Sequence, residues 1–417
     1  MHAERSASRS GAPARPALVV LSTLFPSAAE PVAGVFIKER MFGVARHLPV
    51  VVVSPQPWFP LQSLLRSVRP HYRPPKPSFE KVDGIRIFRP RFFALPGMLR
   101  RLDGLFIALA ALPTLRRLMH DGAADVLDVH FGYPDGYAGY LLSRWTGLPY
   151  AITLRGKEER LRTVAGIGPR MARALKHADL VIAVSAALRQ VGLEMGARGE
   201  ASIQVGNGID IDKFRPIPQS EARLRLGLPR EAKVLVSVGS LVERKGFHRV
   251  IECLPILMRT HPDLHLLVVG SAGPEGDYTT QLTALTRSLQ LDARVHFLGS
   301  VSPTQLHVPL SAADVFVLAT RYEGWANVLL EAMACRLPIV TTRVGGNAEV
   351  VSHPSLGLLV DFGDSPALLT AMDQALQREW DGDTIRAHAE ANTWDGRVAQ
   401  LISLFRRIRS PEATSIG

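Results

Sequence analysis

Short apolar runs alternate with longer amphipathic segments along most of the chain, and this alternation constrains the fold more than any other feature. Most runs are apolar on successive residues, which is typical of parallel strands covered on both faces. The runs of the first half are Ala17–Ser22, Val50–Ser54, Ile85–Phe88, Val126–His130, Tyr150–Leu154, Leu180–Val184 and Ser202–Val205. The pattern then restarts with Val234–Val238, Leu264–Gly270, Arg294–Leu298, Val315–Thr320, Pro338–Thr341 and Gly357–Val360. Two β-α-β series predict an α/β fold with two Rossmann-like, doubly wound domains.

The segment Asn207–Pro218 contains Gly208 and two prolines, and it is the natural linker between the two series. Residues 1–16 are rich in Ala, Ser, Arg and Pro, which predicts a disordered leader rather than a secretory signal. Two such domains on one linker are expected to enclose a cleft at the carboxyl ends of both sheets, where ligands bind in folds of this class.

Composition excludes some classes of protein. Two cysteines, Cys253 and Cys335, cannot build a disulfide framework or a zinc cage, and they suit a reduced cytoplasmic protein. The apolar stretch Gly104–Pro113 is far shorter than the roughly 20 residues of a membrane-spanning helix. A membrane-spanning protein is therefore not expected.

Charge is divided unequally along the chain. Residues 1–210 hold 28 Lys+Arg and 16 Asp+Glu, whereas residues 211–417 hold 21 and 22. Within residues 61–120 there are 12 basic and 3 acidic residues. The asymmetry favours an anionic partner, either nucleic acid or a membrane surface. A proteome that is generally rich in arginine would produce the same bias.

The strongest motif is the segment EGWANVLLEA, from Glu323 to Ala332. It follows a predicted strand, so Glu323 is expected at the strand's carboxyl end and Glu331 on the second turn of a helix that begins near Asn327. Free backbone N–H groups at Ala326–Leu329 and the helix dipole predict a phosphate site. Two carboxylates beside it suit a sugar linked through a diphosphate to a nucleoside. A solvent-facing Glu323 and a structurally paired Glu331 are the alternative.

Two further loops follow strands of the second series. In Gly239–Gly246, which contains Ser240 and Arg244, Lys245 is placed to neutralise a diphosphate, although an ordinary basic loop remains an alternative. In VGGNAE, Gly345 and Gly346 allow either close approach to a ligand or a plain turn.

In the first half, His130 ends one predicted strand and Arg155 follows the next, Tyr150–Leu154. His130 is a candidate to orient a hydroxyl, with Asp135 in the same loop, and Arg155 is a candidate phosphate contact. Gly34, in the loop after the first strand, is a weaker candidate for ligand contact. A satisfied structural histidine is the common alternative for His130.

Some motifs are missing from the sequence. The G-x-G-x-x-G fingerprint does not follow the first strand, and no G-x-x-x-x-G-K-[ST] occurs, which argues against dinucleotide enzymes and P-loop ATPases. No His/Cys/Asp cluster has metal-ligand spacing. The basic half carries no known motif for reading nucleic acid, so that partner is not expected.

Together, EGWANVLLEAMA, VSVGSLVERKG, VGNGID and TTRVGGNAEV resemble the GT-B-fold retaining glycosyltransferases of the family-4 type, or glycosyl transferases group 1. HFGYPDGYAGYLL and TLRGKEE are similar to the branch that builds bacterial exopolysaccharides and teichuronic-type polymers.

The resemblance implies an acceptor-binding domain at residues 17–211 plus 395–417, with the helix at Trp394–Ile408 crossing back to it, and a donor-binding domain at 212–394. It implies Glu323 near the donor sugar, Glu331 on the ribose and Lys245 on the diphosphate, with no metal or other cofactor required. The implied catalytic residues are Glu323, Lys245 and His130, and Arg155 and Asp135 lie on the acceptor side. The implied donor-binding residues are Glu331, Arg244, Ser240, Gly239, Gly324, Ala326, Asn327, Val328 and Gly34.

Three positions depart from the family pattern. Ser240 stands where the phosphate loop usually has Arg, Ala348 replaces a frequent Pro, and Arg336 stands where Gly usually ends a helix. The expected reaction is transfer of a sugar from a UDP- or GDP-sugar to a hydroxyl of a glycan. We expect it at the cytoplasmic face of an anionic membrane that carries a lipid-linked acceptor. The alternatives are a sugar-nucleotide epimerase of the same fold and a non-catalytic two-domain sugar- or nucleotide-binding protein.

Overall fold

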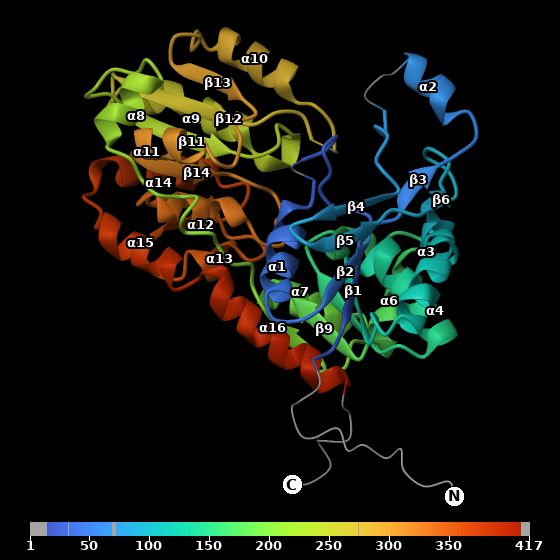
Figure 1. The fold of residues 1–417 in the computed structure, drawn as a ribbon. Helices are drawn as coiled ribbons and strands as arrows, with labels where there is room; N and C mark the ends of the chain where they lie inside the picture. The colour runs from blue at the N-terminus through green and yellow to red at the C-terminus, as the bar shows by residue number, and fades with distance from the viewer. Residues whose placement is uncertain (1–14, 32, 69–71, 274, 410–417) are drawn as a thin grey trace, which may run out of the picture. The chain divides into compact units, whose positions relative to one another are not determined.

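The structure is a computed structural model that describes residues 15–31, 33–68, 72–273 and 275–409 (Figure 1). Most of the predicted leader therefore lies outside the described residues. The strands are β1 Leu18–Leu21, β2 Val50–Val53, β3 Gln56–Trp58, β4 Phe79–Val82, β5 Ile85–Phe88, β6 Arg91–Phe93, β7 Val126–His130, β8 Tyr150–Leu154, β9 Leu180–Ala183, β10 Ser202–Gln204, β11 Lys233–Val238, β12 Leu264–Val269, β13 Val295–Gly299, β14 Val315–Leu318, β15 Ile339–Thr342 and β16 Gly357–Val360.

The α-helices are α1 Val35–Ala45, α2 Gln62–Val68, α3 Asp103–His120, α4 Tyr137–Thr146, α5 Glu158–Leu161, α6 Gly168–His177, α7 Ala186–Glu194, α8 Gln219–Arg225, α9 Phe247–Leu257, α10 Thr279–Ser288, α11 His307–Ala312, α12 Asn327–Ala334, α13 Asn347–Val350, α14 Ser365–Gln377, α15 Gly382–Glu390 and α16 Trp394–Arg409. Short helical turns are η1 Arg100–Leu102, η2 Gly132–Gly136 and η3 Glu243–Lys245.

The first sheet has the strand order β10-β9-β8-β7-β1-β2-β5-β4. Strand β1 lies between β2 and β7 and pairs in parallel with both. The pairings of β2 with β5 and of β9 with β10 are also parallel, whereas β4 at the edge pairs antiparallel with β5. Strand β4 was not predicted because its residues alternate between exposed and half-buried instead of forming an apolar run.

The second sheet has six strands in the order β13-β12-β11-β14-β15-β16, and every pairing in it is parallel. Chain order reverses between β11 and β14. This arrangement is the doubly wound sheet that the sequence predicts, with its topological switch point between those two strands.

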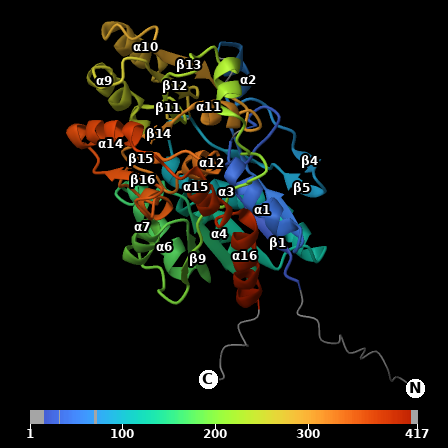
Figure 2. The same cartoon turned by 90° about the vertical axis from the view of Figure 1, so that its left-hand side faces the viewer.

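Successive residues of one strand are buried against different layers, which explains the continuous apolar runs. On β11, Val234 and Val236 belong to one apolar cluster and Leu235 to the other. The first cluster includes residues of α12 and α15, and the second includes residues of α9 and α14. Figure 2 shows these helix pairs on opposite sides of the sheet. Both faces are therefore covered, as parallel sheets require.

Contacts divide the chain into two compact units. One comprises Met1–Ile152, Pro169–Leu180 and Ala399–Gly417, and the other comprises Thr153–Gly168 and Val181–Val398. The last turns of α16 pack with the first unit, where Arg409 lies 3.6 Å from the Asp125 carboxylate. The finer boundaries at 211/212 and 394/395 stay predictions. Among the described residues, no helix is both long and apolar enough to cross a bilayer.

Candidate functional site

The strongest candidate site lies at the switch point of the second sheet. Two loops meet there: residues 239–246 follow β11, and residues 319–326 follow β14, its neighbour in the sheet. The backbone N–H of Arg321 donates to the carbonyl of Arg244 at 2.8 Å, which joins the two loops directly. In open α/β sheets, ligands bind outside the carboxyl ends of the strands at this position.

Glu323 is the centre of a compact ionic cluster. Its Oε1 accepts hydrogen bonds from Lys245 Nζ at 2.5 Å, Arg244 Nη1 at 3.2 Å and Thr320 Oγ1 at 3.1 Å. The Glu323 side chain is 9% exposed and that of Lys245 is 13% exposed. Such charge-assisted bonds, largely shielded from water, fix the carboxylate and both cations in place.

Arg244 joins this cluster to a second carboxylate. Its Nε donates to Glu275 at 2.8 Å, and the guanidinium lies 5.0 Å from the ring centre of Tyr322. Burial disfavours the charged guanidinium, but Glu323 and Glu275 outweigh this effect and raise the pKa of Arg244. Burial likewise opposes ionisation of Glu275, yet its bond to Arg244 leaves the pKa of this carboxyl lowered. At neutral pH both Arg244 and Glu275 therefore carry charge.

Glycine allows the two loops to come this close. Gly246 has φ of +77°, and a Cβ there would lie 1.9 Å from the carbonyl oxygen of Ala319. The residue therefore has to be glycine for backbone reasons, before any ligand is considered. A Cβ at Gly239 would instead contact the Lys245 side chain at 3.5 Å.

The glycine pair after β15 also has a clear structural role. Gly345 has φ of +51°, and a Cβ there would lie 1.7 Å from the carbonyl oxygen of Glu323. The N–H of Gly346 donates to the carbonyl of Gly324 at 3.2 Å. Both glycines thus allow the loop that carries Glu323 to pack closely against the loop after β15. The sequence left open whether this pair approaches a ligand or forms a plain turn, and what the structure shows is close packing of backbone against backbone.

Helix α12 begins one residue earlier than the capping prediction required. Ala326 occupies the N-cap position with no side-chain capping bond, and Asn327 is the first helical residue. Asn327 is therefore not the cap, although it remains at the helix N-terminus with Val328. Glu331 lies on the second turn as predicted, and it is half-buried.

Two predicted residues of the first sheet lie around its own switch point, between β1 and β7. His130 is the last residue of β7 and is fully buried. Asp135 is also fully buried and accepts hydrogen bonds from the N–H and Oγ1 of Thr23, which follows β1, at 3.1 and 3.0 Å. Asp135 thereby ties the two loops together.

Gly34 caps α1 with φ of +72°, and a Cβ there would lie 2.6 Å from the carbonyl oxygen of Leu24. As with Gly246, close approach of backbone explains the glycine at this position.

Arg155 directly follows β8, as predicted, but its side chain is held by protein groups. Its Nη1 donates to Asn207 Oδ1 at 2.8 Å, and its side chain is almost fully buried. Asn207 in turn donates to Asn327 Oδ1 at 2.8 Å within the same compact unit. Asn207 begins the predicted linker, so the NGID segment positions Arg155 as well as connecting elements.

The structure thus brings together Glu323, Lys245 and Arg244, and it places Gly239, Ser240 and Gly324 in the loops around them. Sequence reasoning missed Thr320 and Glu275. Thr320 was counted as the end of a strand, but β14 ends at Leu318 and leaves its hydroxyl in the loop. Glu275 lies in a glycine-containing loop after β12, where no residue pattern marked it.

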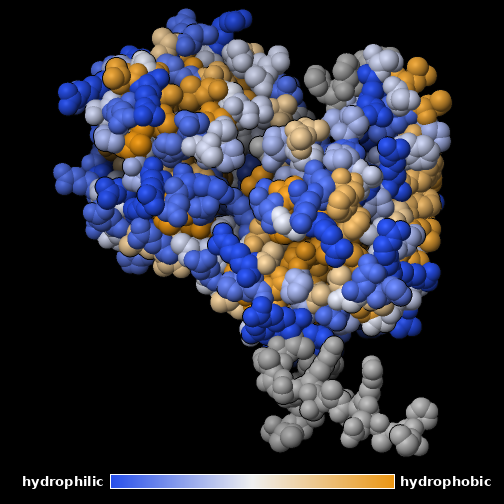
Figure 3. Space-filling model, in the orientation of Figure 1, coloured by the Kyte–Doolittle hydropathy of each residue, from blue (hydrophilic) through white to orange (hydrophobic). Residues whose placement is uncertain are grey.

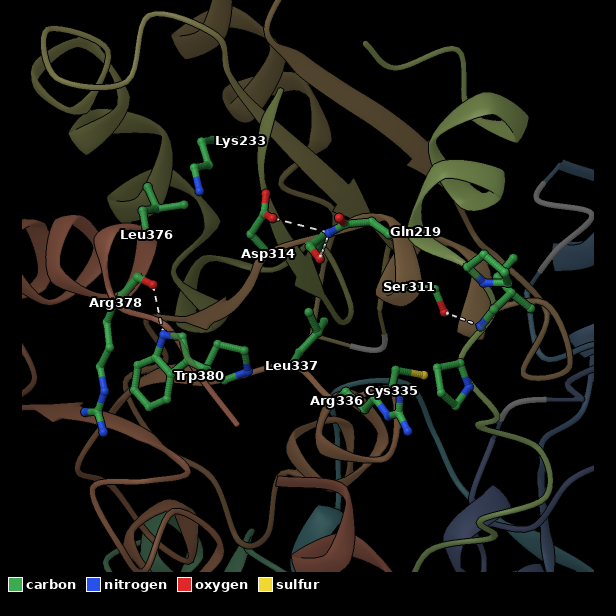
Figure 4. A pocket seen from close by; sticks show the side chains of 16 residues that line it. Gln219, Lys233, Ser311, Asp314, Cys335, Arg336, Leu337, Leu376, Arg378 and Trp380 are labelled. Carbon is green, nitrogen blue, oxygen red and sulfur yellow. Dashed lines mark hydrogen bonds between the residues drawn. The ribbon is translucent and has the colours of Figure 1, made fainter. Parts of the chain in front are cut away.

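A separate cavity of about 610 Å³ lies at the amino ends of the strands of the second sheet, away from the ionic cluster (Figure 4). Lys233, Asp314 and Pro338 line it just where β11, β14 and β15 begin. The Asp314 carboxylate is already bound by Arg223 at 2.9 and 3.1 Å. None of the predicted site residues lines this cavity.

Metal binding receives no support from side-chain clustering. Across the described part of the chain, no group of three or more His, Cys, Asp or Glu residues could hold a metal ion. Both cysteines are buried free thiols, and burial raises the pKa of Cys335 to about 12. That no metal or cofactor is required stays a prediction.

Two family models match the chain in tandem. Residues 44–213 match the family described as Glycosyltransferase Family 4, and residues 218–392 match Glycosyl transferases group 1. Among curated relatives, the TuaC glycosyltransferase of Bacillus subtilis, which is named for teichuronic acid biosynthesis, is 29% identical over 334 residues. That match covers 78% of this chain and 80% of the relative.

Solved structures show the same fold. Sucrose-phosphate synthase from Thermosynechococcus elongatus matches with a TM-score of 0.77 and 21% identity, covering 95% of this chain and 100% of that one. HepE from Anabaena, solved in complex with UDP, matches with a TM-score of 0.67 and 21% identity, covering 93% of this chain and 99% of that one.

The two family matches identify a glycosyltransferase, and the solved structures give it the GT-B fold. The chain belongs to the family-4 type of these enzymes, with the glycosyl transferases group 1 region in its second half. The curated relatives are named as glycosyltransferases and related synthases of glycoconjugates, which favours the transferase over the epimerase and binding-protein alternatives.

Proposed function

We propose that this glycosyltransferase moves a sugar from a UDP- or GDP-sugar to a hydroxyl of a lipid-linked glycan, with retention at the anomeric carbon. The observation that carries the proposal is the cluster in which Glu323 binds both Lys245 and Arg244. Two fixed cations and the N-terminus of α12 at one switch point form a site for a diphosphate. The solved HepE complexes with UDP and with UDP-glucose support a nucleotide-sugar donor.

Charge stabilisation is the main chemical contribution of the site in this proposal. When the glycosidic bond to the diphosphate breaks, negative charge develops on the departing phosphate oxygen. Lys245 and Arg244 stabilise that charge, and Glu331 on α12 binds the ribose hydroxyls. His130, at the end of β7, orients a sugar hydroxyl.

The proposed retention does not use Glu323 as a covalent nucleophile. Its carboxylate already accepts three hydrogen bonds, two of them from cations, and a carboxylate so engaged is a poor nucleophile. A covalent glycosyl-enzyme on Glu323 is therefore disfavoured. The acceptor hydroxyl instead attacks on the face from which the diphosphate leaves, and a departing phosphate oxygen takes its proton.

A membrane location of the acceptor fits the surface of the first unit. Leu61 on the approach to α2 is 73% exposed and Leu64 on that helix is 65% exposed. Met98, before α3, is 62% exposed. Figure 3 shows hydrophobic side chains along the margin that carries α2 and α3. The sequence from α2 to α3 also carries the basic residues Arg66, Arg73, Arg91, Arg100, Arg101, Arg116 and Arg117. Exposed apolar side chains together with basic residues favour binding to anionic bilayers.

The test uses purified full-length protein, a panel of UDP- and GDP-sugars, and vesicles with or without a lipid extract that contains polyprenyl-linked glycans. We expect one donor to release its nucleotide faster with the extract, and the product's anomeric configuration by NMR to equal that of the donor. An inverted product would refute retention. If the rate of nucleotide release does not change with the lipid extract but rises with a water-soluble glycan, the lipid-linked acceptor is refuted.

The contribution of the membrane surface is measured separately by vesicle flotation. Leu61→Ser/Leu64→Ser is expected to reduce binding to anionic vesicles at least several-fold. The matched control is Leu224→Ser, which removes an 81% exposed leucine from α8 of the other unit and should leave flotation unchanged.

A further inference from the structure

Three aromatic side chains of the first unit form a row between helices α4 and α6, which lie side by side (Figure 1). The rings of Tyr137 and Tyr140 on α4 are stacked, with their centroids 5.9 Å apart and their planes inclined by 27°. Tyr140 also stacks on His177, the last residue of α6, with centroids 5.5 Å apart and planes inclined by 28°. Rings at such separations are offset, so part of each face stays uncovered. We call Tyr137, Tyr140 and His177 the aromatic row.

The packing of α4 turns both tyrosines away from the sheet. On the inner side of this helix Ala138 is 0% exposed, and a Cβ at Gly139 would lie 2.6 Å from Val129 Cγ2 on β7. Tyr137 and Tyr140 are three positions apart and lie on the opposite side of the helix. Both are half-buried, and neither hydroxyl group has a hydrogen-bond partner among the described residues. The hydroxyl groups are therefore available to a ligand.

The outer face of α6 is basic. The side chains of this helix that face the interior are each 0% exposed: Met171, Ala174 and Leu175. Arg170, Arg173 and Lys176 lie on the other side, and the Arg170 guanidinium is 5.9 Å from the ring centre of Tyr137. Helices α4 and α6 together contain four Lys+Arg residues and no Asp or Glu. Across the described part of the chain, Arg173 and Lys176 form no ion pair. Like charges three positions apart destabilise a helix, so stability alone does not favour this arrangement.

We propose that the aromatic row and the basic face of α6 bind an anionic glycan. Its carboxylate or phosphate groups pair with Arg173 and Lys176, and its sugar rings lie against Tyr137 and Tyr140. The C–H groups of a sugar ring carry partial positive charge, which the negative face of an aromatic ring attracts. The inference deepens the proposed function, because it names the class of acceptor as a glycan with acidic groups. It rests on that function only in making this glycan the acceptor.

The aromatic row starts at the carboxyl edge of the first sheet. Tyr137 is the first residue of α4 and comes two positions after Asp135, in the segment that follows β7. Arg170 lies in the first turn of α6, in the segment that follows β8. A glycan whose terminal sugar reaches the loop after β7 can therefore extend its preceding sugars along the row.

A bilayer is a less suitable partner for this face. Helices that bind membranes insert exposed apolar side chains. On α6, whose residues are all described, no large apolar side chain is exposed, and on α4 the exposed one is Trp145, at 38%. Single-stranded nucleic acid also combines stacking with contacts to anionic groups, so it is included in the test as a competing ligand.

The test measures binding of two glycan probes to the full-length protein without any donor, by isothermal titration calorimetry at low salt. One probe is an oligogalacturonate, which carries a carboxylate on every sugar, and the other is a neutral malto-oligosaccharide of the same length. We expect the oligogalacturonate to bind about 10-fold or more tightly than the neutral probe. Tyr140→Leu and Arg173→Gln/Lys176→Gln should each weaken its binding about 10-fold or more. Tyr140→Phe keeps the ring and should bind within about three-fold of wild type.

The matched control is Arg259→Gln/Arg287→Gln, which removes two exposed arginines from the other unit and should leave oligogalacturonate affinity unchanged. An equal loss in this control would overturn the proposal, since net charge alone would then govern binding. Equal affinity for both glycans, or wild-type affinity in Arg173→Gln/Lys176→Gln, would overturn it as well. So would tighter binding of a single-stranded oligothymidylate that carries as many charges as the oligogalacturonate.

Turnover separates this inference from the proposed function. In the assay with the lipid extract, Tyr140→Leu and Arg173→Gln/Lys176→Gln should raise the KM for the acceptor about 10-fold, with the KM for the nucleotide sugar as in wild type. If the oligogalacturonate binds through the aromatic row but no donor is turned over, the binding surface stands and the proposed function fails. If both variants turn over a donor with an unchanged KM for the acceptor, the proposed function stands and this inference fails.

Discussion

Glu323 and Lys245 are 78 positions apart in the sequence, yet Glu323 Oε1 and Lys245 Nζ lie 2.5 Å apart in the structure. The loops after two neighbouring strands bring them together at the switch point. The ammonium group proposed to bind a diphosphate is thus held by a carboxylate of the same site. A diphosphate must compete with Glu323 for it, and this competition has measurable consequences.

Removing either member of this pair should affect nucleotide binding in opposite ways. Lys245→Met deletes a phosphate-binding cation, so we expect UDP or GDP affinity to fall about 10-fold or more. Glu323→Gln frees Lys245 from its carboxylate, so nucleotide affinity should stay equal or rise, while kcat falls about 100-fold or more. Isothermal titration calorimetry and nucleotide release measure the two effects.

The matched control for Lys245→Met is Lys233→Met, at the opposite end of β11. It should leave both affinity and turnover unchanged. A parallel fall of nucleotide affinity in Glu323→Gln and Lys245→Met would contradict the competition between carboxylate and phosphate.

The variant Gly345→Ala tests the close packing of the Gly345 backbone against the loop that carries Glu323. The new Cβ would lie 1.7 Å from the Glu323 carbonyl oxygen, so the loop must move and turnover should fall at least 10-fold. Gly227→Ala is the control, because Gly227 has φ of +67° and a Cβ there would meet no atom of the described residues within 4 Å. That variant should lose only about 1 kcal/mol of unfolding free energy, with normal turnover. Equal turnover in both variants would count against the packing role of Gly345.

Stability should depend on pH through Asp103, at the start of α3. Burial raises the pKa of this carboxyl to about 6, although Arg100 and Arg73 oppose the shift. Since the folded state binds this proton more tightly than the unfolded state, the contribution to stability is complete below about pH 4 and is lost as pH rises towards 6.

Asp103→Asn should therefore raise the unfolding free energy at pH 8 by about 1 kcal/mol, after allowance for solvent screening of a half-exposed group. The gain should vanish near pH 4. Urea denaturation at both pH values measures it, with Asp121→Asn at the other end of α3 as the control. A gain of equal size at both pH values would show that ionisation is not its cause.

Arg336 follows α12 with φ of +69°, in the left-handed region where the family usually has glycine. Arg336→Gly should increase the unfolding free energy by up to about 1 kcal/mol, because glycine adopts this conformation without strain. Its ion pair with Asp383, at 2.7 Å, joins two exposed side chains and contributes little. Arg336→Ala removes the pair but keeps the Cβ. A similar loss of stability in both variants would show that the pair outweighs the strain.

The sequence predicted the two sheets well, because parallel strands buried on both faces are written as continuous apolar runs. Each of the predicted strands has a counterpart, from Val126–His130, which matches β7 in full, to Val315–Thr320, which β14 matches only as far as Leu318. Strands β3, β4 and β6 were not predicted, because they are short and most of their residues are exposed or half-buried.

The sequence predicted a site residue only where a charged side chain lies in the loop that follows a predicted strand. Glu323 and Lys245 meet both conditions, so their positions were predictable. Glu275 does not, since it lies in an irregular loop. Its role depends on the guanidinium of Arg244, to which it is hydrogen-bonded, and only the folded chain brings the two together. The prediction that Asn327 caps α12 was wrong by one residue, a common error at helix ends.

The role of Glu323 in sugar transfer is tested most directly by release of free UDP or GDP from a panel of nucleotide sugars. Three proteins are compared: wild type, Glu323→Gln and Glu252→Gln. Glu252 is an exposed glutamate on α9 and serves as the matched control. We expect wild type and Glu252→Gln to release the nucleotide from one donor, and Glu323→Gln to do so about 100-fold more slowly or less, although its nucleotide binding is intact. Equal release by all three proteins would contradict the assignment of the site.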